Sequence, residues 1–91
     1  NRKRNAPRVR LGIQFEAIEE GLRVTSVQEG SAAAQSGLQK DDILRQLDGM
    51  DLGNTNDLTA VLRRLEPGKE YPLAVGRKGR DLKLRIVPER R

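Results

Sequence analysis

One glycine interrupts a strand-like stretch near the start of this 91-residue chain. In residues 8–17, apolar side chains alternate with polar ones, which is the pattern of a half-buried β-strand. Gly12 takes one of the polar positions, between Leu11 and Ile13. A glycine inside a strand marks a bulge or a place where another group approaches the backbone closely. We therefore predict that Gly12 serves either the fold alone or the approach of a ligand to the main chain.

Side chains for nucleophilic or metal chemistry are scarce. The chain contains no Cys and no His, so it has no thiolate or imidazole that could act as a nucleophile, a base or a metal ligand. Ser26, Ser31 and Ser36 therefore have no imidazole to activate them, and only a Ser–Lys pair stays open as a catalytic arrangement. We expect this chain to be non-catalytic, with no metal and no cofactor.

The positive charge of the chain is concentrated at its start. The net charge is +5, and five basic residues lie within the first ten positions: Arg2, Lys3, Arg4, Arg8 and Arg10. A basic arm can bind nucleic acid or an anionic membrane, but Asn5-Ala6-Pro7 is typical of a linker. We favour a linker over 1–7, one domain over 8–88 and a tail over 89–91. Because the chain begins with Asn and shows no signal peptide, we expect it to be a piece of a longer protein.

Local patterns predict a small mixed sheet with two helices over its openings. Ser31 suits the N-cap of a short helix and Gly37 suits its left-handed C-terminal position. Apolar residues recur at helical spacing in a second, longer helix. We expect strands at 8–17, 22–27, 43–47, 50–52, 71–75 and 82–86, and helices at 32–36 and 55–65.

Three stretches together resemble a PDZ domain of the kind attached to bacterial envelope proteases. They are Arg10-Leu11-Gly12-Ile13, which looks like the carboxylate-binding loop; residues 30–44, which look like a helix–turn–strand unit; and residues 66–68 with 75–79, which look like the closing hairpin of HtrA-type modules. The resemblance runs from about Arg8 to Val87. It implies an α+β fold, a small, partly open β-barrel or sandwich of five to six strands with two helices. It also implies the bacterial, circularly permuted topology, in which the last strand takes the place of the first.

The resemblance also implies a site. Backbone N–H groups of Leu11, Gly12 and Ile13 would bind the C-terminal carboxylate of a peptide, and the missing side chain of Gly12 would let it approach. Arg10, with Arg8, would add long-range attraction. The peptide would run antiparallel to residues 13–17 and add a strand to the sheet.

The other groove residues implied by the resemblance are Gln14, Phe15, Thr55, Leu58, Thr59 and Leu62, while Val61 and Leu65 would face the core. Packing in the core explains Leu58 and Leu62 equally well. Family members that select Ser or Thr two residues before the peptide end carry His at the start of the second helix, where this chain has Thr55. We therefore expect apolar residues in the last positions of the peptide and modest selectivity.

The leading hypothesis is a peptide-binding module that captures C-terminal or extended apolar segments and regulates an attached envelope protease of the HtrA type. Its expected partners are peptides or unfolded proteins with apolar C-termini and the catalytic domain of the parent protein, without nucleic acid and without insertion into a membrane. The alternatives are a module of a metallopeptidase or of a secretion component, and a basic domain that binds nucleic acid or anionic surfaces. A domain that only joins subunits is a further possibility.

Overall fold

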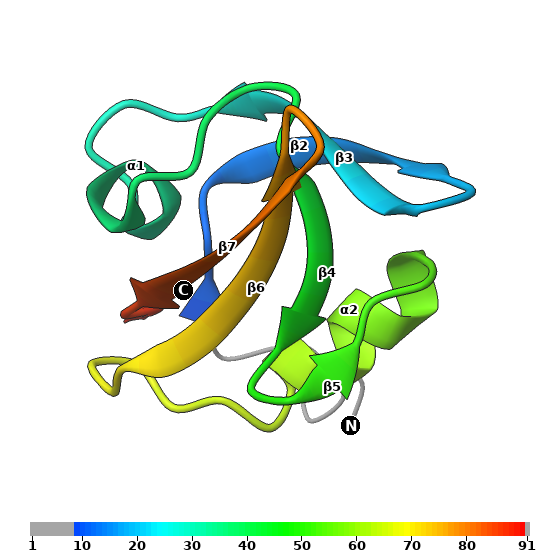
Figure 1. The fold of residues 1–91 in the computed structure, drawn as a ribbon. Coiled ribbons are helices and arrows are strands. Elements are labelled where there is room, and N and C mark those ends of the chain that lie inside the picture. Colours follow the sequence, from blue (N-terminus) through cyan, green and yellow to red (C-terminus); the bar gives the residue numbers. More distant parts are fainter. Residues whose placement is uncertain (1–8, 91) are drawn as a thin grey trace.

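Eight strands and two helices follow one another along residues 9–90, which are the residues that the computed structural model describes (Figure 1). The elements are β1 (Val9–Arg10), β2 (Ile13–Ile18), β3 (Gly21–Val27), α1 (Ala32–Ser36), β4 (Ile43–Leu47), β5 (Met50–Asp51), α2 (Thr55–Leu62), β6 (Tyr71–Arg77), β7 (Arg80–Ile86) and β8 (Glu89–Arg90). The order from β2 to β7 is the order that the sequence predicts. The residues Arg2, Lys3, Arg4 and Arg8 of the basic arm lie outside the described part of the chain.

The strands form one six-stranded antiparallel sheet and a separate pair. The sheet has the order β2-β3-β4-β6-β7, with β5 added to β4, and β1 pairs with β8. The sheet does not close, so β2 and β7 are its edges. Figure 1 shows α1 and α2 at opposite ends of the sheet. The α+β class and the partly open sheet with two helices are confirmed.

Apart from shifts of one or two residues at strand ends, the structure differs from the sequence-based expectation at three places. The first expected strand is split, because Gly12 has a φ of +81° and turns the chain between β1 and β2. The second helix ends at Leu62 rather than at residue 65, since the N–H groups of Arg64 and Leu65 donate to carbonyls three residues back. Residues 89 and 90, expected to be a tail, form β8.

The core lies on the inner face of the curved sheet. Its largest fully buried apolar side chains come from five strands and from the loop after β5: Leu22, Val24, Leu44, Leu47, Leu52, Leu73, Val75, Ile86 and Val9. Each buried aliphatic side chain of this size contributes about 1.5–3 kcal/mol through removal of apolar surface from water. Val61 and Leu65 are buried in the same cluster, as predicted.

The predicted caps of α1 are both present. Ser31 Oγ accepts a hydrogen bond from the N–H of Ala34 at 3.1 Å, and Gly37 has a φ of +95°. The helix therefore begins and ends where the two cap residues predict. The hairpin of β2 and β3 is irregular near Ser26, because the register between the two strands shifts beside Gln14.

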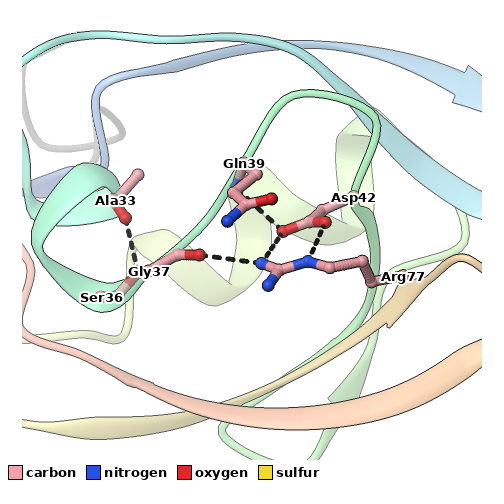
Figure 2. A network of polar contacts seen from close by, with 6 residues as sticks. All are labelled: Ala33, Ser36, Gly37, Gln39, Asp42 and Arg77. Atoms are coloured by element: carbon pink, nitrogen blue, oxygen red, sulfur yellow. Dashed lines mark hydrogen bonds and ion pairs between the residues drawn. The ribbon is translucent and has the colours of Figure 1, made fainter.

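A buried ion pair joins α1, the loop before β4 and the end of β6 (Figure 2). Asp42 is 1% exposed and accepts hydrogen bonds from Arg77 Nε at 2.8 Å and Arg77 Nη2 at 2.7 Å, while the N–H of Gln39 donates to its Oδ2 at 2.9 Å. Arg77 Nη2 also donates to the carbonyl of Gly37. These hydrogen bonds to Asp42 raise the pKa of the Arg77 guanidinium above its usual value. The network fixes the C-terminal end of α1 against the sheet.

Candidate groove beside the glycine loop

A groove of about 800 Å³ lies between the edge strand β2 and the helix α2. Its volume is in the range of pockets that bind small molecules. The residues that line it are Val9, Arg10, Leu11, Gly12, Ile13, Gln14, Phe15, Ser26, Gln28, Leu58 and Leu62. The groove therefore brings the glycine loop, one sheet edge and one helix face together.

The edge of β2 presents main-chain groups that β3 does not use. Ile13 lies opposite Val27, and the N–H of Gln28 donates to the carbonyl of Gly12 at 2.8 Å. This bond makes Ile13 and Val27 a pair without mutual hydrogen bonds, so the N–H and C=O of Ile13 point away from β3. Phe15 lies opposite Val24. The N–H of Val24 donates to the carbonyl of Asp42 and its carbonyl accepts from the N–H of Asp41, so neither group is used by Phe15. Two alternate residues of β2 thus offer a template for one more strand.

The carbonyls of the glycine loop are held by the fold. The Leu11 carbonyl accepts from the N–H of Ala33 in α1 at 2.9 Å, and the Gly12 carbonyl accepts from Gln28. In a trans peptide the N–H points opposite to the C=O of the same unit, and the described chain has no cis peptide bond. The N–H groups of Gly12 and Ile13 therefore point away from α1 and β3, on the side of the groove. Adjacent N–H groups in such a turn form a concave anion-binding element.

The missing side chain of Gly12 has a reason inside the fold. A Cβ at this position would lie 2.3 Å from Ser31 Cβ and 2.8 Å from Ser31 Oγ. The φ of +81° also disfavours any residue with a side chain. Of the two roles expected for this glycine, the fold alone or the approach of a ligand, the first has a direct cause in the structure, because the N-cap of α1 packs on it.

The wall opposite β2 is apolar. Leu58 is 2% exposed and Leu62 is half-buried, and both line the groove together with the buried Leu11 and the half-buried Ile13. Leu58 therefore belongs to the core and to the groove at once.

The structure places most of the residues proposed from the sequence around this groove. Those that line it are Arg10, Leu11, Gly12, Ile13, Gln14, Phe15, Leu58 and Leu62. Thr55 and Thr59 lie on α2 but are not among the lining residues. Thr55 is exposed at the first turn and Thr59 is half-buried.

Three lining residues have no counterpart in the sequence analysis: Val9, Ser26 and Gln28. Ser26 pairs with Gln14 across β2 and β3, so the register of this hairpin is the signal that identifies it. Gln28 follows β3 directly and reaches the loop through its N–H bond to Gly12.

The electrostatics of the groove depend on one side chain. Among the described residues that line it, Arg10 alone is charged, and it is exposed. Residues 9–90 hold equal numbers of acidic and basic residues, so the whole excess of +5 lies in residues 1–8 and in Arg91. The described part of the chain therefore has no net positive charge with which to attract a polyanion.

Residues 9–90 contain neither a metal-binding cluster nor a membrane-spanning helix. No group of three or more His, Cys, Asp or Glu side chains within this range is placed to hold a metal ion. No helix within the same range is both long enough and apolar enough to span a lipid bilayer.

Comparisons with known proteins agree with this geometry. The sequence profile of a family described as "PDZ domain" matches residues 9–87. Among curated relatives, "Regulator of sigma-E protease RseP" of Escherichia coli is 39% identical over 79 residues, which are 86% of this chain and 16% of that protein. "Periplasmic pH-dependent serine endoprotease DegQ" of Escherichia coli is 29% identical over 70 residues, 77% of this chain and 15% of that protein. The chain thus spans about one sixth of the length of these relatives.

Solved structures with the same fold include a protease with a bound peptide. "HtrA-type protease AlgW with decapeptide" superposes with a TM-score of 0.86 at 22% identity, over 93% of this chain and 30% of that one. The HtrA3 PDZ domain bound to a phage-derived ligand superposes with a TM-score of 0.78 at 23% identity, over 89% of this chain and 86% of that one. At these identities the similarity establishes the fold.

Proposed function

The chain belongs to the PDZ domain family, and we propose that it is a peptide-binding module that captures the C-terminal end of an extended apolar peptide as an added strand on β2. The carboxylate of the peptide binds the N–H groups of the glycine loop. The main chain of the peptide pairs with the free side of Ile13 and Phe15.

The observation that carries the proposal is the orientation of two peptide units. Hydrogen bonds from Ala33 and Gln28 hold the carbonyls of Leu11 and Gly12 inside the fold. The N–H groups of Gly12 and Ile13 are therefore preorganised toward the groove, and no cationic side chain has to supply the affinity. The exposed Arg10 adds attraction for an anion at the mouth of the groove.

The lining of the groove favours an apolar last residue in the peptide. Leu11, Ile13, Leu58 and Leu62 offer only aliphatic surface, so a Val, Leu, Ile or Phe side chain is buried there without an unsatisfied polar group. The polar groups of Thr55 and Thr59 lie outside the lining, which supports modest selectivity at earlier peptide positions. We expect a Kd of roughly tens of micromolar, about −6 to −7 kcal/mol.

The similarity to larger proteases supports a regulatory role in a parent enzyme. DegQ is named as a periplasmic serine endoprotease and RseP as a protease, and the chain matches only a small part of each. We place the module in a bacterial envelope protease, an HtrA-type serine protease first. A metalloprotease like that named "Zinc metalloprotease RasP" in Oceanobacillus iheyensis, 28% identical over 78 residues, is the second choice. In either parent the module would deliver or sense peptide ends.

The proposal is tested by titrating the chain with a fluorescent peptide that ends in Val, as the free acid and as the C-terminal amide. An amide is neutral and carries its own N–H donors, so it loses the charge-assisted bonds to the loop, and we expect its Kd to rise by about tenfold or more. Equal affinity for the two forms would remove the carboxylate from the mechanism.

A pair of substitutions tests the groove wall. Leu62→Glu puts a carboxylate into the apolar groove and is expected to abolish measurable binding of the free-acid peptide. Met50→Glu is the matched control, because Met50 is 42% exposed on β5 and does not line the groove. If Leu62→Glu binds as the unmodified chain does, α2 is not the wall of the site.

A further inference from the structure

A strand pair of only two residues on each side lies directly beside the glycine loop. β1 and β8 pair over two residues each, with Val9 opposite Arg90 and Arg10 opposite Glu89. Leu11 and Gly12 follow β1 without a break. A shift of β8 would therefore also shift the loop, through its pairing with β1. Almost the whole chain separates the two segments in sequence, but they lie together in the fold (Figure 1).

Glu89 connects β8 to the first turn of α1. Its Oε1 accepts a hydrogen bond from the N–H of Ala32, the first residue of α1, at 3.1 Å. The next N–H of the helix, that of Ala33, donates to the carbonyl of Leu11. Two successive N–H groups of the first helical turn thus bind Glu89 and the glycine loop, respectively.

The geometry points to Glu89 as a positioning residue that holds the carboxylate-binding loop in its competent orientation, an inference that rests on the proposed function. The carboxylate fixes the start of α1, and Ala33 in turn fixes the direction of the Leu11 carbonyl. The Gly12 N–H points opposite to that carbonyl, so a rotation of the first helical turn moves the donor that faces the peptide. Glu89 is not among the residues that line the groove.

We expect the pairing of β1 with β8 to open with a small free-energy change. A ladder of two residues contributes few hydrogen bonds. Within β8, Glu89 is half-buried and Arg90 is exposed. Such segments open locally with a free energy far below that of global unfolding. The fraction of molecules with β8 in place then scales the apparent affinity for the carboxylate of a free-acid peptide, which an amidated peptide lacks. Peptide binding at the loop and docking of β8 therefore stabilise each other.

The first test measures the acid preference, defined as the Kd of the amidated peptide divided by the Kd of the free acid. Glu89→Ala is expected to lower this ratio by about fivefold, the factor that corresponds to one hydrogen bond. Glu89→Gln keeps an oxygen acceptor for the Ala32 N–H and is expected to stay within about twofold of the unmodified chain. Glu70→Ala is the matched control, since Glu70 contacts exposed Arg85 at 3.3 Å and does not line the groove.

A variant that only weakened the fold would lower binding of both peptide forms alike and would leave the ratio unchanged. An unchanged ratio in Glu89→Ala overturns the inference. If the unmodified chain itself shows a ratio near one, the proposed function fails instead, and the two failures are thereby distinguished.

The second test needs no variant and therefore does not depend on whether Glu89→Ala folds. Because coupling between two sites is reciprocal, saturating free-acid peptide is expected to slow hydrogen exchange of the Ala32 N–H by about the same factor of five. The amidated peptide is expected to slow it much less. Unchanged exchange at Ala32 with the free-acid peptide bound would refute the coupling.

Discussion

Replacing Gly12 by alanine tests whether the packing of the loop on α1 requires this glycine. A new Cβ would lie 2.3 Å from Ser31 Cβ, well inside the 3.4 Å at which ordinary contact begins. The φ of +81° costs about 1–2 kcal/mol for a residue with a side chain, and overpacking of this kind adds about 1–3 kcal/mol. The lower flexibility of Ala in the unfolded chain returns about 0.4–1 kcal/mol. We expect Gly12→Ala to lower the free energy of unfolding by about 1–5 kcal/mol.

A second glycine provides the matched control. Gly79 has a φ of +78°, almost the same as that of Gly12, but a Cβ there would meet no atom within 4 Å. Gly79→Ala therefore carries the backbone cost without the steric one, and we expect a loss of about 1 kcal/mol. Urea unfolding followed by circular dichroism measures both values, and each kcal/mol corresponds to a shift of about 4–8 °C in Tm for a domain of this size.

The steric contribution is isolated by adding Ser31→Gly. This substitution removes both atoms that the new Cβ would strike, and Gly replaces Ser at an N-cap for only a few tenths of a kcal/mol. The double variant is expected to recover about 1–3 kcal/mol relative to the sum of the single variants. Additive effects, or equal losses for Gly12→Ala and Gly79→Ala, would refute the packing argument.

Two further predictions concern stability. Asp42→Asn removes the carboxylate that accepts two hydrogen bonds from Arg77. Arg77 is 25% exposed and can regain water, which reduces the cost of breaking the pair. We expect the free energy of unfolding in urea to fall by about 2–4 kcal/mol. Asp81→Asn, on a side chain 90% exposed, is the control and should change stability by less than about 0.5 kcal/mol, so similar losses would contradict the importance of burial. Leu44→Ala removes most of a fully buried side chain of the central strand β4. We expect the free energy of unfolding to fall by about 2–5 kcal/mol and the calorimetric Tm to fall with it. An unchanged Tm would contradict the assigned core.

Elements that depend on interactions between neighbouring residues are predictable from the sequence, whereas features that depend on distant contacts are not. Strands β3, β4, β6 and β7 and the helix α1 follow from patterns within a few residues, namely alternation of apolar side chains and the caps at Ser31 and Gly37. The end of α2 is less well predicted, because the apolar spacing continues to Leu65 while the backbone tightens after Leu62. A buried Leu65 satisfies the pattern without being helical.

The candidate site shows the same division. The glycine loop and the apolar residues of α2 are visible in the sequence, since each is a local arrangement of residue types. Ser26 and Gln28 enter the groove only because the register of β2 on β3 places them there.

What the sequence by itself determined is the set of local elements and the residue types around the glycine loop, because side-chain periodicity and capping act between neighbours in the chain. Only the tertiary structure decided that Ser31 packs on Gly12 and that Glu89 holds the start of α1 from 57 residues away. Contacts of that kind depend on the path of the whole chain, and a short polar segment such as β8 carries no periodic pattern from which its partner could be inferred.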